Sequence, residues 1–285
     1  MKNISSGEDA LSNLFMPFVH MGDVSSILKN RKLASKLKDN RSVTINGTKI
    51  NRLQSGKERG FLQFRYKGKE LRFYYDSGKR MMETLGMIRD EFINQESARI
   101  EVKKRDVVDI GAYVADTSIL FALNGARHVY ALEPYPYFYG LGMKNIEANR
   151  LSKKITLLNA ACGSENSTVE ISDKETNFSR VQSTKRKGKG IGIMSLENVI
   201  KKYNLKGASL KVDCEGCEYD IILKTDSNML RRFDNIQIEY HYGYSNLVKR
   251  LREVGFKVSF TKPVKKYNFV TRSFMVIGFI NASLR

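Results

Sequence analysis

The spacing of hydrophobic residues divides the chain into two parts. In the first part, apolar and β-branched residues flank Asn46-Gly47. Further along, the apolar runs Phe61–Tyr66 and Leu71–Tyr75 flank a second turn that contains Gly68. Each arrangement predicts a β-hairpin. Helical spacing before residue 40, and again after Gly78, predicts helices on either side of the hairpins. The second helix carries one apolar stripe, made by Met81, Leu85, Ile88 and Phe92. Residues 1–100 are therefore predicted to form a small N-terminal α+β cap.

From residue 101 onward, short apolar runs alternate with longer amphipathic segments. The expected strands are Val107–Ile110, His128–Glu133, Ile155–Ala160, Ser209–Asp213 and Asn235–His241. The expected helices are Thr117–Leu123, Tyr137–Asn149, Leu196–Tyr203, Glu218–Leu230 and Ser245–Val254. This alternation predicts an α/β fold with a parallel sheet and helices on both faces, over residues 101–285. The last two apolar runs, Phe256–Phe260 and Phe274–Ile280, are joined by a loop with Pro263, so we expect them to be antiparallel.

The turn after the first of these strands carries the clearest chemical signal. Asp109 precedes Gly111 there, and a helix begins near Asp116. Glycine lets the backbone turn sharply, and the unpaired N–H groups of a helix start suit a carboxylate or phosphate. Glu133 ends the next strand, where an acid can accept both hydroxyls of a ribose. Tyr113 would crowd a pyrophosphate, so S-adenosylmethionine (SAM), with its ammonium, carboxylate and ribose, fits better than a dinucleotide.

Four segments together resemble the FkbM-type SAM-dependent methyltransferases. They are Asp109-Ile-Gly-Ala-Tyr-Val-Ala-Asp-Thr-Ser118, Ala131-Leu-Glu-Pro134, Asn159-Ala-Ala-Cys-Gly163 and Leu210-Lys-Val-Asp-Cys-Glu-Gly-Cys-Glu218. The resemblance implies a Rossmann-like class I methyltransferase fold, whose seven-stranded, mostly parallel sheet has an antiparallel last strand. It also implies methyl transfer to a hydroxyl oxygen of a sugar, glycan or other small molecule. The cofactor-binding residues are then Asp109, Gly111, Ala112, Tyr113, Asp116, Thr117, Ser118, Glu133, Pro134, Asn159 and Ala160.

Two residues depart from the pattern of that family. Tyr113 stands where the family usually has Asn, and Ala115 where it usually has Gly. Tyr113 could alter the methionine end of the cofactor pocket. The departures keep open a SAM-binding scaffold without catalysis as an alternative function.

Polar side chains at the ends of the fourth and fifth strands are the candidate catalytic residues. They are Asp213, Glu215, Glu239 and His241. The carboxyl ends of parallel strands share one edge of a sheet, so these side chains should border the methyl group of the cofactor. His241 is the expected base for the acceptor hydroxyl, because the ordinary pKa of histidine is near neutral. We expect no metal. The alternative is an Mg²⁺ ion held by Asp213 and Glu239.

Charge and composition widen the choice of acceptor. The chain has a net charge of +19, which favours an anionic partner. A glycine-rich basic loop offers Lys185, Arg186, Lys187 and Lys189 as substrate-binding residues. An RNA methyltransferase that uses this loop and the basic cap is the leading alternative.

Cysteine usage and hydropathy bear on the compartment. No apolar run approaches the length of a membrane span. Three cysteines do not make a disulfide framework, so we expect small core cysteines and a reducing cytoplasm.

Overall fold

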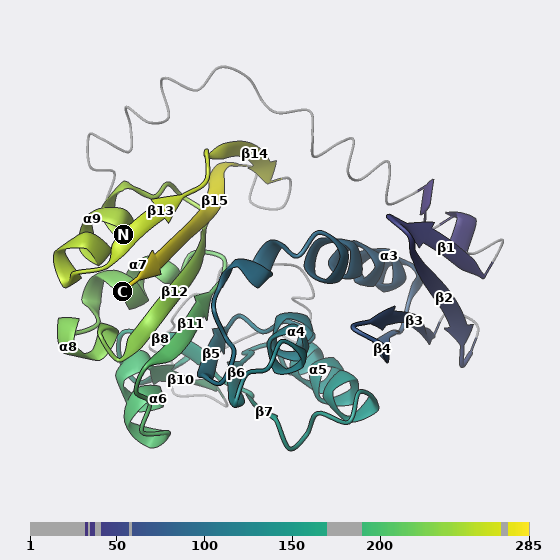
Figure 1. The fold of residues 1–285 in the computed structure, drawn as a ribbon, viewed down its shortest axis with the longest axis horizontal. Coiled ribbons are helices and arrows are strands. Elements are labelled where there is room, and N and C mark those ends of the chain that lie inside the picture. Colours follow the sequence, from purple (N-terminus) through teal and green to yellow (C-terminus); the bar gives the residue numbers. More distant parts are fainter. Residues whose placement is uncertain are drawn as a thin grey trace.

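The computed structural model describes residues 32–33, 35–37, 41–56, 59–169, 190–268 and 273–284. Its centre is an eight-stranded mixed sheet, in which seven strands follow the order β13-β15-β12-β11-β5-β6-β7 and β14 pairs with β15 (Figure 1). The strands are β5 (Asp106–Ile110), β6 (His128–Leu132), β7 (Ile155–Leu158), β11 (Ala208–Val212), β12 (Phe233–Tyr240), β13 (Lys257–Phe260), β14 (Val264–Asn268) and β15 (Ser273–Ser283). The α/β Rossmann-like fold expected from the sequence is therefore present.

The strand directions agree with the expectation, but the number of strands does not. Neighbouring strands from β7 to β12 are parallel, and β15 runs antiparallel to both β12 and β13. The sheet has eight strands rather than seven, because Val264–Asn268 forms β14 along the first half of β15. The sequence analysis expected only a loop near Pro263. The adjacent lysines Lys265 and Lys266 hide the apolar alternation by which a strand is recognised.

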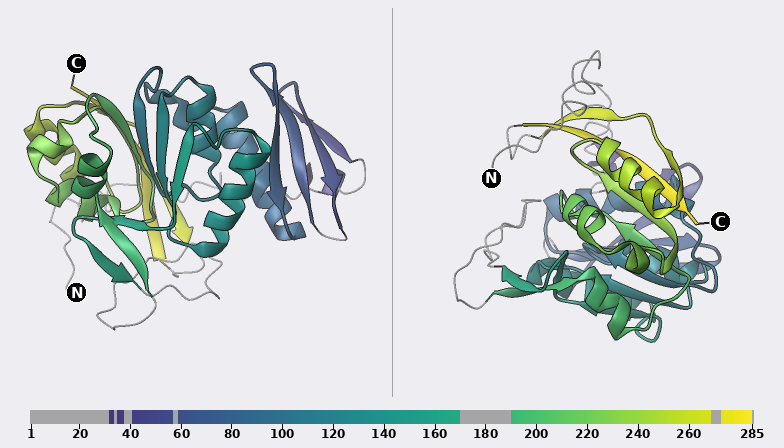
Figure 2. Two further views of the ribbon diagram at one scale, coloured as in Figure 1. Left: turned by 90° about the horizontal axis from the view of Figure 1, so that it is seen from below. Right: turned by 90° about the vertical axis from the view of Figure 1, so that its left-hand side faces the viewer.

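Helices cover both faces of the sheet, as the alternation predicted (Figure 2). One face carries α4 (Asp116–Leu123) and α5 (Pro136–Ala148), and the other carries α6 (Leu196–Lys202), α7 (Glu218–Lys224), α8 (Ser227–Leu230) and α9 (Ser245–Val254). Val107 and Val108 of β5 show how the two faces divide. Both are fully buried, but Val107 packs in the cluster with α4 and Val108 in the cluster with α6.

The helix expected over residues 218–230 is interrupted. Helix α7 ends at Lys224, and the Asp226 carboxylate accepts the N–H of Asn228 to begin the short helix α8. The side chain of an N-cap aspartate accepts a backbone N–H that has no partner at the start of a helix. A cap at Asp226 therefore marks the beginning of a new helix. In the sequence, the amphipathic spacing of residues 218–230 hides this cap signal.

The N-terminal hairpins form a separate four-stranded antiparallel sheet. Its strands are β1 (Ser42–Ile45), β2 (Thr48–Gln54), β3 (Gly60–Tyr66) and β4 (Lys69–Tyr75). The turn residues Asn46, Gly47, Lys67 and Gly68 all have positive φ (44°, 80°, 48° and 78°), as tight two-residue hairpin turns require. The chain continues through α3 (Gly78–Met87), a π-helical turn η1 (Ile88–Ile93) and a 3-10 turn η2 (Glu96–Arg99).

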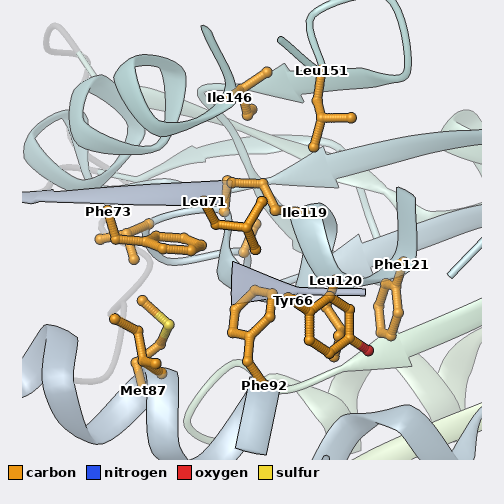
Figure 3. Packing of buried hydrophobic residues seen from close by; sticks show 14 of the residues in the cluster. Tyr66, Leu71, Phe73, Met87, Phe92, Ile119, Leu120, Phe121, Ile146 and Leu151 are labelled. Carbon is orange, nitrogen blue, oxygen red and sulfur yellow. The ribbon is translucent and has the colours of Figure 1, made fainter. Parts of the chain in front are cut away.

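The N-terminal elements share a hydrophobic core with the sheet domain. Phe73 of β4, Met87 of α3 and Phe92 of η1 lie in one buried cluster with Ile119 and Leu120 of α4 (Figure 3). Burial of side chains of this size typically contributes about 1.5–3 kcal/mol each. The N-terminal sheet is therefore packed against the α4 face, and the division into domains 1–100 and 101–285 stays a prediction.

A third, three-stranded sheet was not expected from the sequence. It consists of β8 (Ala161–Gly163), β9 (Ser167–Val169) and β10 (Ile191–Ser195), in the order β8-β10-β9. Strands β8 and β9, of three residues each, carry too little alternation to be recognised, and the five-residue β10 begins within the glycine-rich basic stretch that was expected to be a loop. Within the described part of the chain, no helix is long and apolar enough to cross a membrane.

Candidate active site

The turn between β5 and α4 brings the backbone of two strands into contact. Gly111 has φ +78°, and a Cβ placed there would lie 1.7 Å from the Asp213 carbonyl oxygen. Asp213 also donates its backbone N–H to Ile110. Glycine is thus required at this position by the approach of the loop after β11. A contact of Gly111 with the cofactor stays a prediction.

Asp109 lies beneath this turn and is fully buried. Its Oδ2 accepts hydrogen bonds from Thr117 Oγ1 at 2.7 Å and Ser118 Oγ at 2.6 Å. Its Oδ1 lies 3.3 Å from Lys211 Nζ, which in turn donates to the Gly111 carbonyl at 3.1 Å. These contacts fix β5, the turn and the start of α4 to one another. A direct contact of Asp109 with the cofactor stays a prediction.

Glu133 follows β6 and faces the same turn. Its carboxylate accepts the backbone N–H of Tyr113 at Oε2 and that of Tyr135 at Oε1, each at 2.8 Å. Burial raises the pKa of Glu133 to about 8, although both of these hydrogen bonds favour the ionised form. Asn159 holds the adjacent backbone by donating to the carbonyls of Glu133 and Pro134. The remaining lone pairs of Glu133 can accept the two hydroxyls of a ribose.

The start of α4 contains a second acid. Asp116 is the first helical residue rather than the N-cap, which is Ala115 in the left-handed region with φ +64°. Burial raises the pKa of Asp116 to about 7, since neighbouring acids add to the cost of its charge and Lys211 offsets only part of it.

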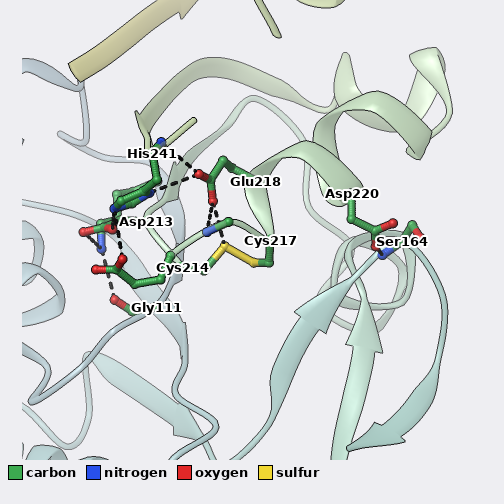
Figure 4. Close-up of a disulfide and its surroundings, with 11 residues drawn as sticks. Gly111, Ser164, Asp213, Cys214, Cys217, Glu218, Asp220 and His241 are labelled. Atoms are coloured by element: carbon green, nitrogen blue, oxygen red, sulfur yellow. Dashed lines mark hydrogen bonds and ion pairs between the residues drawn. A yellow bond between two sulfur atoms is a disulfide. The ribbon is translucent and has the colours of Figure 1, made fainter. Parts of the chain in front are cut away.

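The ends of β11 and β12 bring together three of the predicted catalytic residues. Ligand-type atoms of Asp213, Glu215 and His241 all lie within 4.8 Å of one another (Figure 4). His241 Nε2 is 3.8 Å from Asp213 Oδ1 and 3.6 Å from Glu215 Oε2. Glu239 borders the group, and burial together with the Asp213 charge raises the pKa of its carboxyl well above the ordinary value. The four residues therefore form one acidic cluster around an imidazole.

Glu218, at the start of α7, fixes the orientation of His241. Its Oε1 lies 3.0 Å from His241 Nδ1 and accepts the His241 backbone N–H at 3.2 Å, while its Oε2 accepts the N–H of Gly216. Burial alone would lower the pKa of His241. The hydrogen bond to Glu218 and the charges of Asp213 and Glu215 outweigh it and raise that pKa to about 10.

The sequence profile described as Methyltransferase FkbM domain matches residues 109–258, slightly more than half of the chain. The chain belongs to the FkbM methyltransferase family. It is therefore a SAM-dependent methyltransferase, as the four motifs implied. The matched segment contains every residue of the glycine turn, of the Glu133 region and of the acidic cluster.

Solved structures resemble this FkbM-family chain only distantly. A Pyrococcus horikoshii protein named as a transferase is 14% identical, with a TM-score of 0.45 over 90% of this chain and 83% of that one. A tRNA m1G37 methyltransferase of M. jannaschii is 16% identical, with a TM-score of 0.43 over 91% and 69%. No curated protein matches the sequence. At such TM-scores these structures carry no weight for the acceptor.

The cysteines of this FkbM-family protein correct the sequence analysis. Cys214 and Cys217 form a disulfide across the loop between β11 and α7, and Cys162 is the buried free cysteine. The expectation of three core cysteines is wrong for two of them, because the turn at Gly216 brings the two Sγ atoms together. The disulfide removes the basis on which a reducing cytoplasm was expected, and that compartment stays a prediction.

Lys211 and Glu218 are the site residues that sequence reasoning missed. A signal for Lys211 was present, since a lysine within the apolar run Leu210-Lys-Val212 needs a buried partner. Glu218 ends the FkbM-like segment and begins an expected helix, but nothing local indicates its contact with His241. The predicted substrate-binding residues Lys185, Arg186, Lys187 and Lys189 lie outside the described residues.

Proposed function

We propose that this FkbM-family protein transfers the methyl group of SAM to a hydroxyl oxygen of a sugar, glycan or other small molecule. The observation that carries the proposal is the acidic cluster of Asp213, Glu215, Glu239 and His241 beside the glycine turn. An ionised carboxylate can accept hydrogen bonds but cannot donate them. This surface therefore suits a methyl acceptor whose O–H groups donate hydrogen bonds.

The residues around the glycine turn fit the cofactor. Glu133 offers carboxylate oxygens to the ribose hydroxyls, and the eight-residue helix α4 presents its first N–H groups at the turn. SAM supplies a methyl group on a positively charged sulfur. The chain contributes position and charge: Asp109 and Lys211 hold the turn in place, and the cluster orients the acceptor. Because His241, with a pKa raised to about 10, already holds a proton at neutral pH, the Asp213 carboxylate takes the proton of the acceptor.

The RNA alternative has a structural observation in its favour. On the N-terminal sheet, Arg72 lies over the ring of Phe61 at 5.3 Å, and Lys144 of α5 lies over Tyr74 at 4.0 Å. Basic and aromatic side chains are the residue types with which proteins bind single-stranded nucleic acid, through phosphate contacts and base stacking, and here they lie side by side. A SAM-binding scaffold without catalysis is the remaining alternative.

One labelling experiment separates the three functions. The purified protein is incubated with methyl-labelled SAM and cell extract fractionated into small molecules, glycans and RNA. We expect label in the small-molecule or glycan fraction, stable to ribonuclease. A matched reaction with Asp213→Asn should transfer at least 100-fold less label. Label that ribonuclease releases would favour RNA, and SAM binding without label in any fraction would favour the scaffold.

A further inference from the structure

We propose that Asp213, Glu215 and His241 form a binding site for one divalent transition-metal ion of the Mn²⁺ or Zn²⁺ type. From the sequence we expect no metal, with an Mg²⁺ ion on Asp213 and Glu239 as the alternative. The structure points to a different set of ligands, which includes an imidazole and the loop residue Glu215.

The three ligand atoms are spaced closely enough to share an ion. Nε2 of His241 lies 3.8 Å and 3.6 Å from the two carboxylate oxygens, beyond the usual range of a hydrogen bond. Ligands at bond lengths of about 2.0–2.2 Å from one ion lie about 3–3.5 Å apart. The two carboxylate oxygens lie within 4.8 Å of each other, so side-chain movements on the order of 1 Å would complete the site.

His241 is oriented as a metal ligand would be. Its side chain is 3% exposed, and its Nδ1 is committed to the fully buried Glu218 carboxylate at 3.0 Å. A metal ion would replace the proton on Nε2, while the proton on Nδ1 stays in the hydrogen bond to Glu218. A carboxylate behind the ring is the common support of a ligating histidine. The buried imidazole is thus aimed with Nε2 into the space between Asp213 and Glu215.

The loop after β11 holds Glu215 in place. Glu215 has φ +56°, a conformation that costs free energy for any residue other than glycine, and the following Gly216 has φ +118°. The Cys214–Cys217 disulfide closes this same four-residue segment. A strained loop closed by a covalent bond keeps the Glu215 carboxylate on the side of His241.

The charge of the cluster also favours a cation. Two carboxylates, those of Asp213 and Glu215, face the imidazole, and Lys211 reaches Asp213 Oδ2 only at 3.7 Å. Imidazole nitrogen suits Zn²⁺ and related ions, and carboxylates suit Mn²⁺ and Mg²⁺. A set of one imidazole and two carboxylates therefore favours a borderline transition metal over the all-oxygen coordination typical of Mg²⁺.

Metal binding can be measured without SAM or an acceptor, so its failure and that of the proposed function are distinguishable. Protein stripped with a chelator is dialysed against Mn²⁺ or Zn²⁺, and bound metal is counted per chain. Co²⁺ then reports ligation through its visible absorption. We expect one ion per wild-type chain, and at least tenfold weaker binding in Glu215→Gln and in His241→Ala.

His128 provides the matched control, since it lies at β6 and bonds Thr156 away from the cluster. His128→Ala should bind metal as the wild type does. Glu215 is about one third exposed, so Glu215→Gln should fold even if His241→Ala does not. Glu218→Gln should weaken binding about 10- to 100-fold through the lost support of His241. No metal on the wild type, or equal binding by the folded Glu215→Gln variant, would overturn the proposal.

Discussion

At the scale of single residues, we infer that Glu133 contributes most directly to cofactor binding, through hydrogen bonds to the ribose. Removal of its carboxylate in Glu133→Ala should weaken binding by roughly 1–3 kcal/mol, because charged hydrogen bonds to the ribose are lost. Adenosine is the best probe, since it carries the ribose and does not itself ionise between pH 6 and 9.

The raised pKa of Glu133 gives adenosine binding a pH dependence. The pKa is about 8, so the carboxylate fraction, and with it the affinity, should increase as the pH rises from 6 to 9. Titration calorimetry across this range measures the change. The Glu133→Gln variant, which cannot ionise, should bind weakly at every pH. A flat profile for the wild-type protein would argue against the contact.

Ala115 offers a test of backbone strain in the glycine turn. Its φ of +64° is unfavourable for a residue with a Cβ. Ala115→Gly should therefore leave the free energy of unfolding unchanged or raise it, by up to about 1 kcal/mol. The control Ala122→Gly, within α4, should lower it by about 1 kcal/mol. Equal losses in denaturant titrations of the two variants would show that Ala115 is not strained.

At the scale of elements, the disulfide in the loop between β11 and α7 should matter more for activity than for stability. It closes a four-residue loop, for which the chain-entropy estimate is only about 2 kcal/mol. The double variant Cys214→Ser/Cys217→Ser should keep its SAM affinity but lose turnover, because the loop that carries Glu215 is released. Reductant should affect the wild type in the same way and leave the double variant unchanged. Full turnover of the reduced wild type would contradict this role.

The basic segment after β9 is a second element with a testable role. Replacing Lys185, Arg186, Lys187 and Lys189 with serine should raise the apparent KM for an anionic acceptor and leave SAM affinity unchanged. Added salt should raise the KM of the wild type in the same direction, since it screens the same charges. If neither the substitutions nor salt alter the KM, the segment does not bind the substrate.

At the scale of the whole molecule, the sequence predicted the strands whose apolar residues alternate or run together, and it missed strands that are very short or in which that pattern is hidden. The run Asn235–His241 corresponds to β12, whereas β14, with Lys265 and Lys266, was expected to be a loop. The gathering of Asp213 with His241 was predictable, because carboxyl ends of parallel strands share an edge. The Glu218–His241 contact and the disulfide depend on positive φ at Glu215 and Gly216, which no local pattern specifies.

The central claim is that one crevice joins a cofactor site at Glu133 to an acceptor site at Asp213 and His241. The most direct measurement is a crystal structure with S-adenosylhomocysteine, the product left after methyl transfer. We expect the ribose hydroxyls on Glu133 and the sulfur facing the cluster of Asp213, Glu215 and His241. A ribose that does not contact Glu133, or a sulfur directed away from that cluster, would contradict the account.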